Sequence, residues 1–286
     1  MAKVSIKSGA LFVVATPIGN LADISARALE ILARVEVIAA EDTRHTRQLL
    51  QHFAITTPCV ALHEHNERQQ VPGLLVRLQQ GERVALVSDA GTPLISDPGF
   101  HLVRAARQAG IQVVPIPGAS ALITALSASG LPSDRFVFEG FLPARGEARR
   151  RRLEELQHDT RTLIFYEAKH RILDTLEDMQ AVFGAGRESV LARELTKTFE
   201  TIHQGALQEQ LALLARDANQ CKGEFVILIA GAAAEQRHEV SVRAERVLAV
   251  LLEELPVKQA AALAAKITGG KKNQLYEMAL ALKTVK

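Results

Sequence analysis

The chain has 286 residues, 48% of them hydrophobic, and a formal net charge of +2. This length suffices for two domains that each bury a core of their own. The sequence has no apolar run of the roughly 18 residues that a membrane span needs and no signal-peptide pattern at its start, so we expect a cytoplasmic protein without a membrane partner. The two cysteines, Cys59 and Cys221, lie far apart and match no metal-binding spacing, so we expect no metal.

Positive charge is concentrated near the end of the chain. Residues 256–286 hold six lysines and one acid, a net charge of +5, whereas the preceding 255 residues carry −3. This distribution predicts an anionic partner for the C-terminal part.

The first part of the chain alternates apolar strand-like runs with helical patterns. Because such alternation is typical of a parallel sheet covered by helices, residues 1–117 are predicted to form an N-terminal α/β domain. The predicted strands cover residues 11–16, 35–40, 59–62, 84–87 and 111–116, and the predicted helices cover residues 23–34, 74–80 and the segment between Gly99 and Gly110.

One loop of this domain has the residues of a binding site. The apolar run at residues 84–87 is typical of a strand buried on both faces, and it ends in S-D-A-G-T-P at residues 88–93. Small and acidic residues at the carboxyl end of such a strand lie where open α/β sheets bind ligands. An ordinary strand–turn–helix connection is the alternative.

The next part has fewer helices for each strand. We therefore predict a mixed sheet in a second α/β domain over residues 118–232, opened by a helix with Ser120 as its cap and Gly130 at its end. Strands are predicted at residues 136–140, 162–166, 189–193, 200–204 and 225–229, and helices at residues 148–157, 171–183 and 207–219.

A polar linker at residues 235–239 precedes a third segment. Three apolar helical faces lie within residues 240–286, and a glycine turn between the last two is followed by Lys271 and Lys272. The pattern predicts a small basic helical module, which is either a helix-turn-helix or a dimerisation or capping module.

Charged side chains elsewhere leave alternatives open. His63 and His65 share one face of a strand as two zinc ligands do, but no further ligands follow at a matching spacing, which favours a polar loop. Asp42 and Arg44 either hold substrate or belong to a helix start capped through Thr43.

The densest charge run is R-R-R-R at residues 149–152, which is either a solvated helix start or a contact for phosphates. The sequence lacks GxSxG and GxGxxG, and the loop at residues 16–21 lacks the lysine of a P-loop. These absences argue against a serine hydrolase, a conventional dinucleotide site and a nucleoside triphosphate site.

Several motifs occur together in one order. They read T-P-I-G-N-L (residues 16–21), A-E-D-T-R-H-T (40–46), S-D-A-G-T-P-L-I-S-D-P-G (88–99), P-G-A-S-A (117–121), F-E-G-F-L-P (138–143), F-Y-E (165–167), A-R-E-L-T-K-T (192–198) and K-G-E (222–224). In these motifs the chain resembles the tetrapyrrole methylase family over nearly its whole length. Within that family it resembles the branch that methylates the 2′-hydroxyl of a cytidine in small-subunit (16S) ribosomal RNA.

The resemblance implies two α/β domains with S-adenosylmethionine in the cleft between them, a homodimer, and 16S ribosomal RNA, within the 30S subunit, as the partner. Carried over position by position, the cofactor-binding residues are Pro17, Ser88, Asp89, Ala90, Gly91, Thr92, Ser120, Ala121, Glu167 and Leu195. Ser88 stands where the family has glycine. The predicted substrate-binding residues are Asp42, Arg44, Arg149, Arg150, Lys271 and Lys272.

The expected reaction needs little acid–base chemistry. A ribose hydroxyl is a poor nucleophile, so a carboxylate or a lysine beside it can take or polarise its proton. Glu167, Glu194 and Lys197 lie at the ends of predicted strands and are the candidate catalytic residues, with a structural salt bridge as the alternative for each.

Two other functions stay open. One is methylation of a small tetrapyrrole, which the lysine-rich end of the chain disfavours. The other is a non-catalytic RNA-binding or assembly factor, which the intact cofactor loops disfavour.

Overall fold

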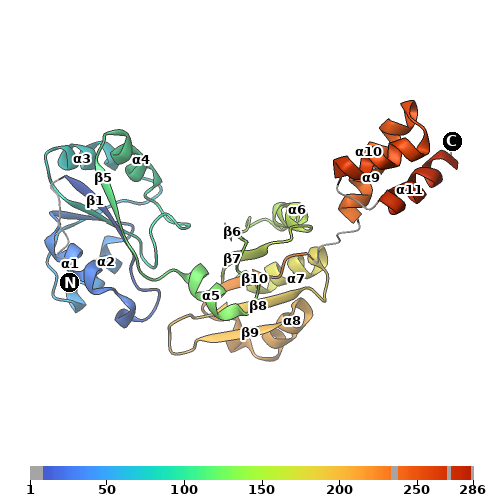
Figure 1. Cartoon of the computed structure of the whole chain (residues 1–286). Coiled ribbons are helices and arrows are strands. Elements are labelled where there is room, and N and C mark those ends of the chain that lie inside the picture. Colours follow the sequence, from blue (N-terminus) through green and yellow to red (C-terminus); the bar gives the residue numbers. More distant parts are fainter. Residues whose placement is uncertain (1–8, 233–237, 269–271, 285–286) are drawn as a thin grey trace. The chain divides into compact units, whose positions relative to one another are not determined.

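The computed structural model describes residues 9–232, 238–268 and 272–284. The chain divides into two compact units, Met1–Gly231 and Ala232–Lys286, and each is described by itself (Figure 1). Most of the predicted linker, residues 235–237, lies outside the described residues. Within the described part, no helix is long and apolar enough to cross a membrane.

The first sheet of the large unit is parallel throughout, as predicted, with the strand order β3-β2-β4-β1-β5. Its strands are β1 (Ala10–Val14), β2 (Val37–Ala40), β3 (Cys59–Ala61), β4 (Val84–Val87) and β5 (Gln112–Ile116). Every residue of the central strand β4 is buried, which explains its uninterrupted apolar run.

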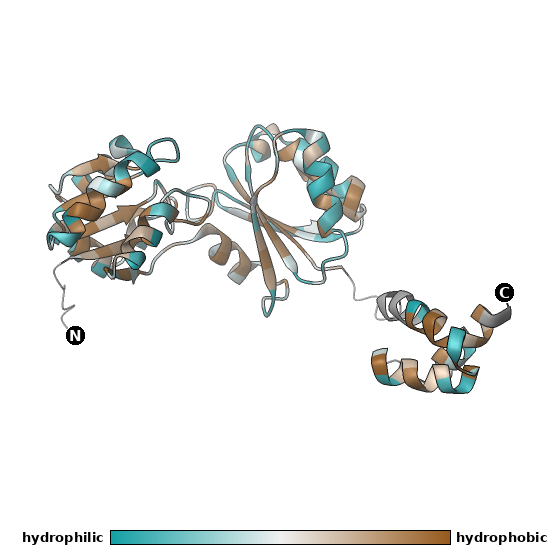
Figure 2. Cartoon of the chain, turned by 90° about the horizontal axis from the view of Figure 1, so that it is seen from above, coloured by the Kyte–Doolittle hydropathy of each residue, from teal (hydrophilic) through white to brown (hydrophobic). Residues whose placement is uncertain are grey.

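Helices cover both faces of this sheet. Residues of α1 and α2 pack on one face beside Phe12, and residues of α3 and α4 pack on the opposite face beside Leu11. Strands of this sheet are largely hydrophobic in Figure 2, as burial on two faces requires. The helical elements are η1 (Leu21–Asp23), α1 (Ala26–Arg34), α2 (Thr43–His52), α3 (Glu67–Gln79) and α4 (Phe100–Gln108).

Two helix starts differ from the prediction. The helix predicted from residue 23 begins at Ala26, because the Ser25 hydroxyl accepts the Ala28 N–H and caps it there. The helix predicted from residue 74 begins at Glu67 and continues through Pro72, so the loss of one backbone donor does not end it.

The second sheet is mixed, as predicted, with the order β6-β7-β10-β8-β9. Only β6 and β7 are parallel, and the other neighbours are antiparallel. The strands are β6 (Phe136–Phe141), β7 (Thr162–Ala168), β8 (Glu188–Arg193), β9 (Thr201–Ala206) and β10 (Glu224–Ile229).

The two faces of this sheet carry different helices. On one face α5 packs against alternate residues such as Ile164, and on the other α6, α7 and α8 pack against their neighbours such as Phe165. The helical elements are α5 (Ala121–Ser129), α6 (Gly146–Leu156), α7 (Ile172–Phe183), α8 (Leu207–Arg216) and η2 (Ala218–Cys221).

Among its described residues, the C-terminal unit contains three helices, α9 (His238–Glu254), α10 (Val257–Thr268) and α11 (Lys272–Thr284). Its core is built largely from alanines, with Leu248 and Leu275, so the helices can approach closely. Gly269, Gly270 and Lys271 lie outside the described residues, as does the side chain of Lys272.

Candidate active site

The carboxyl ends of β1 and β4 mark the point where the first sheet changes winding direction. After β1 the chain turns to the helices of one face, and after β4 it turns to those of the other. The two loops are joined, because the Thr16 N–H donates to the Gly91 carbonyl (2.9 Å) and the Gly91 N–H donates to the Thr16 carbonyl (3.1 Å). Diverging connections at neighbouring strands open a crevice for ligands.

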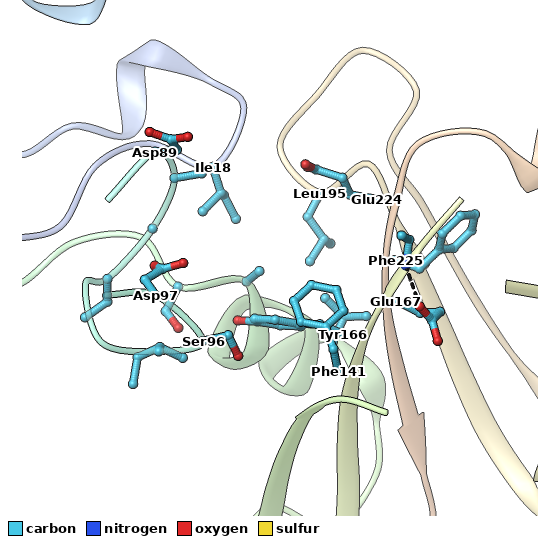
Figure 3. A pocket seen from close by; sticks show the side chains of 18 of the residues that line it. Ile18, Asp89, Ser96, Asp97, Phe141, Tyr166, Glu167, Leu195, Glu224 and Phe225 are labelled. Carbon is cyan, nitrogen blue, oxygen red and sulfur yellow. Dashed lines mark hydrogen bonds between the residues drawn. The ribbon is translucent and has the colours of Figure 1, made fainter. Parts of the chain in front are cut away.

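A pocket of about 330 Å³ lies at this crevice. The first sheet contributes the loops after β1, β2 and β4, and the second contributes α5 and residues at the ends of β6, β7, β8 and β10 (Figure 3). The lining comprises Ile18, Glu41, Asp89, Ala90, Gly91, Thr92, Ile95, Ser96, Asp97, Ser120, Ala121, Phe141, Tyr166, Glu167, Ala168, Leu195, Glu224, Phe225 and Val226.

Sharp turns shape the loop between β4 and α4. Leu94 and Ser96 have positive φ angles of 73° and 67°, and Gly99 has a φ of 123°. Only glycine fits at position 99, because a Cβ there would lie 2.6 Å from the Leu86 side chain. Figure 3 shows Asp97 on this loop, on the side of the pocket away from Phe225.

The pocket carries concentrated negative charge. Burial raises the pKa of Asp97 to about 7, a hydrogen bond with Ser88 opposes the rise, and the charges of Glu41 and Asp89 add to it. Burial also raises the pKa of Glu41. A partly desolvated site with several carboxyl groups favours a positively charged ligand.

Tyr166 links the pocket to the start of α5. Its hydroxyl accepts the Leu122 N–H at 3.1 Å, which is a capping bond, whereas the side chain of Ser120 makes none to the backbone of this helix. Ser120 therefore occupies the N-cap position of α5, as predicted. The capping hydrogen bond, however, is formed by the Tyr166 hydroxyl and not by the Ser120 side chain. Burial raises the pKa of Tyr166, so this hydroxyl is protonated at neutral pH.

The described residues contain no group of three or more His, Cys, Asp or Glu that could hold a metal ion. In the loop after β3, the rings of His63 and His65 are in edge contact, with centroids 6.1 Å apart.

Comparisons with known proteins identify the family to which the chain belongs. The sequence matches the family model of tetrapyrrole (corrin/porphyrin) methylases over residues 10–210. The chain belongs to this family. A model described as the RsmI C-terminal HTH domain matches residues 238–283, which supports the helix-turn-helix among the alternatives for the basic module.

This tetrapyrrole methylase has curated relatives of similar length. It is 61% identical over 276 residues to ribosomal RNA small subunit methyltransferase I of Pseudomonas aeruginosa, covering 96% of this chain and 98% of the relative. It is 60% identical over 272 residues to the protein of that name from Escherichia coli O157:H7, covering 95% of each. The chain is therefore a methyltransferase.

A solved structure shares its fold. Uroporphyrin-III C-methyltransferase from Thermus thermophilus, complexed with S-adenosylhomocysteine, matches with a TM-score of 0.53 at 16% identity, covering 77% of this chain and 96% of that one. The predicted fold class, two α/β parts of the tetrapyrrole methylase type with a helical module, is confirmed.

The structure brings most of the predicted cofactor residues together. Asp89, Ala90, Gly91, Thr92, Ser120, Ala121, Glu167 and Leu195 all line the pocket of this methylase. Pro17 and Ser88 are buried beside lining residues but are not themselves part of the lining.

The side chain of Glu167 points away from the pocket. Along β7, Tyr166 faces α5, so its neighbour Glu167 faces α7, and in Figure 3 the two side chains point to opposite sides of this strand. The Thr175 hydroxyl donates to the Glu167 carboxylate at 2.6 Å. Arg171 lies 3.4 Å from the same oxygen. Glu167 thus contributes backbone to the lining, and its carboxylate is engaged behind the sheet.

Glu194 and Lys197 form an ion-pair cluster with Glu224. The Lys197 Nζ lies 2.9 Å from Glu194 Oε1 and 2.7 Å from Glu224 Oε2. Burial lowers the pKa of Lys197, but hydrogen bonds with both carboxylates outweigh it and raise the pKa on balance. The lysine therefore stays charged at neutral pH and has no lone pair with which to accept a proton.

This cluster also contacts the loop after β1. The Asn20 N–H donates to the Thr196 hydroxyl at 3.1 Å, and a Cβ at Gly19 would lie 2.4 Å from the Lys197 side chain. Glycine at this position therefore permits the close approach of the two loops.

The predicted substrate residues lie outside the pocket lining. Arg44 forms an ion pair with Asp42 (2.8 Å) at the start of α2 and is largely exposed. The side chain of Arg149 is buried and bonded to Asp178, which also binds Arg150 (2.9 Å). Arg149 therefore has a structural partner inside the protein.

Sequence reasoning missed part of the lining. Asp97, Phe141 and Tyr166 line the pocket but are not among the predicted site residues; Tyr166 ends the strand predicted at residues 162–166, and Phe141 directly follows the one predicted at residues 136–140. A second acidic residue within ten positions of Asp89, on the same loop, is the signal that points to Asp97.

Proposed function

We propose that this methyltransferase transfers the methyl group of S-adenosylmethionine to the 2′-hydroxyl of a cytidine ribose in small-subunit (16S) ribosomal RNA. The observation that carries the proposal is the acidic pocket at the β1/β4 crevice, in a chain 61% identical along its length to a ribosomal RNA small subunit methyltransferase I.

The residues present fit the cofactor. S-adenosylmethionine carries an ammonium and a sulfonium charge, which the carboxyl groups of Asp89 and Asp97 can neutralise. Its adenosine needs apolar walls and backbone polar groups, which Ile18, Leu195 and Ala121 supply. When bound, the cofactor supplies an activated methyl group. The residues that we propose to hold it are Pro17, Ser88, Asp89, Ala90, Gly91, Thr92, Asp97, Ser120, Ala121, Leu195 and the backbone of Glu167.

An exposed aromatic side chain at the pocket suits a nucleic-acid substrate. Phe141 is 53% exposed and contacts Tyr166, with ring centroids 5.7 Å apart. Unpaired RNA bases stack on such rings. We propose that a flipped nucleotide of the RNA enters beside Phe141.

The basic module and the start of α2 supply phosphate contacts in this proposal. Lys271 and Lys272 belong to the tail of net charge +5, and Arg44 is a largely exposed cation at the first sheet. Arg149 is left out because it is buried against Asp178.

Three further points belong to the proposal. We expect the enzyme to act on the RNA within the 30S subunit, to form a homodimer and to work in the cytoplasm. We also propose domain limits at residues 1–117, 118–232 and 240–286, which keep each sheet whole, although α9 begins two residues before the third part, at His238.

Transfer of labelled methyl tests the function. We expect label from S-adenosylmethionine in the RNA of 30S subunits, in an alkali-resistant dinucleotide, since a 2′-O-methyl group blocks cleavage at that ribose. Label only in a tetrapyrrole precursor would contradict the substrate. Failure to bind the cofactor would favour a non-catalytic RNA-binding factor.

A further inference from the structure

A transfer to a ribose oxygen requires a group that takes the hydroxyl proton, and the three predicted candidates do not offer one. The Glu167 carboxylate lies behind the second sheet. Glu194 and Lys197 are paired with each other, and Lys197 also pairs with Glu224. The base therefore has to come from another side chain that lines the pocket.

Three side-chain carboxyls of the first sheet line the pocket, and two of them have other partners. Oδ1 of Asp89 accepts the Asp42 backbone N–H at 2.9 Å, which fixes the loops after β2 and β4 together. Asp97 is hydrogen-bonded to the Ser88 hydroxyl and is the carboxyl that we propose for the cofactor. Glu41 is the third.

Glu41 has a free acceptor at the pocket. It directly follows β2, the neighbour of β4, and its Oε2 lies 3.4 Å from the Asp89 backbone N–H. Its other oxygen, Oε1, accepts no hydrogen bond from any described residue, and it is not among the fully buried atoms. The Glu41 carboxylate is therefore held by one oxygen at the start of the loop between β4 and α4, and its other oxygen is open to a ligand.

We infer that Glu41 is the catalytic base for the proposed function, and that its carboxylate takes the proton of the ribose 2′-hydroxyl. The O–H bond breaks and its proton passes to Glu41, while the ribose oxygen forms the new bond to the methyl carbon. The carbon–sulfur bond breaks with its electron pair left on sulfur, so the sulfonium charge is lost and a neutral thioether leaves.

The surroundings make Glu41 a better base than an exposed glutamate. Burial raises its pKa, the negative charges of Asp89 and Asp42 raise it further, and the backbone bond from Asp89 and the charge of His63 lower it. Asp97 is also close enough for the two charges to interact. A base whose pKa is nearer to neutrality accepts a proton more effectively in the transition state.

His63 lies near Glu41. The charge of its ring acts on Glu41, and its Nδ1 is buried without a hydrogen-bond partner among the described residues.

The test compares Glu41→Gln with Glu64→Gln in the full-length protein. Glu64 lies in the loop after β3, is exposed and does not line the pocket, so the control makes the same charge change near the same sheet edge. We measure single-turnover methyl transfer to 30S subunits at saturating S-adenosylmethionine, the cofactor's Kd by calorimetry, and the melting temperature. Glu41→Gln is expected to slow transfer by about 10²-fold or more with unchanged Kd and melting.

Two readouts separate a base from a structural carboxylate. In the wild type, the rate of methyl transfer should rise with pH at the acidic end of the pH profile. Glu41→Gln should lose this rise, whereas Glu64→Gln should keep it. Glu41→Ala should regain turnover when formate is added, because formate replaces the missing carboxylate.

The outcomes distinguish the inference from the proposed function. If the wild type methylates 30S subunits and Glu41→Gln does so equally fast, only the inference fails. A Glu41→Gln protein that does not fold, or that loses cofactor affinity, also overturns it, because Glu41 then has a structural or cofactor role. If the wild type methylates no ribosomal RNA, the proposed function fails first.

Discussion

The guanidinium of Arg149 and the carboxylate of Asp178 form a buried ion pair, with Nε 2.6 Å from Oδ2. Their side chains are 6% and 11% exposed, and they join α6 to α7 behind the second sheet. Arg149, the first of the four consecutive arginines of α6, therefore stabilises the fold.

We expect Asp178→Ala to lower the free energy of unfolding by about 3–5 kcal/mol, because Arg149 would remain buried without its partner. Urea unfolding followed by circular dichroism measures this. Glu147→Ala removes an exposed pair with Arg151 and should cost at most about 0.5 kcal/mol. Equal effects of the two substitutions would contradict the structural assignment of Arg149.

The affinity for S-adenosylmethionine should depend on pH through Asp97. Its pKa of about 7 means that the carboxyl is neutral below that pH and charged above it. Because the cofactor is cationic at its ammonium and sulfonium groups, binding should strengthen as the pH rises through 7, with about a tenfold loss for each pH unit below. Calorimetry at pH 6, 7 and 8 measures the change.

Asp97→Asn should bind the cofactor weakly and with little dependence on pH in this range. Asp134→Asn is the matched control, because Asp134 is exposed and lies outside the pocket. A pH dependence that persists in Asp97→Asn would assign the titration to another group.

Tyr166→Phe should destabilise the start of α5. The substitution removes the hydroxyl that accepts the Leu122 N–H, and a buried donor without an acceptor costs about 1–3 kcal/mol. Unfolding of the large unit by circular dichroism measures the loss. Tyr276→Phe lies in the other unit and should leave that transition unchanged.

Glu67 should stabilise α4 although it belongs to α3. Its carboxylate is buried and accepts the N–H groups of His101 (2.8 Å) and Leu102 (3.2 Å), at a helix start where the cap residue, Gly99, has no side chain. Glu67→Ala is expected to lower stability by about 1–2 kcal/mol. Glu64→Ala, three residues earlier and exposed, should have no effect, and a comparable loss would argue against capping.

The strands and their loops could be predicted because local patterns determine them. The apolar run at residues 84–87 needs burial on two faces, so it becomes a central parallel strand whose carboxyl end borders the pocket. The lower ratio of helices to strands after residue 130 likewise indicated the mixed sheet.

Side-chain direction and pairing could not be predicted in the same way. Glu167 reaches the far face because β7 alternates with a period of two, and the face that borders the pocket is set by packing against α5. The partner of Arg149 lies 29 positions away on α7, so no spacing rule identifies it. The helix through Pro72 forms because Leu74 and Leu78 bury against the first sheet, which outweighs the missing donor.

The position of Tyr166 gives the protein a built-in optical reporter. The chain contains two tyrosines and no tryptophan, so its near-ultraviolet emission comes from Tyr166 in the pocket and Tyr276 in the C-terminal unit. In Tyr276→Phe protein all of that emission originates at the pocket. Ligand titrations can then be followed by intrinsic fluorescence alone, without a label and without interference from the basic helical module.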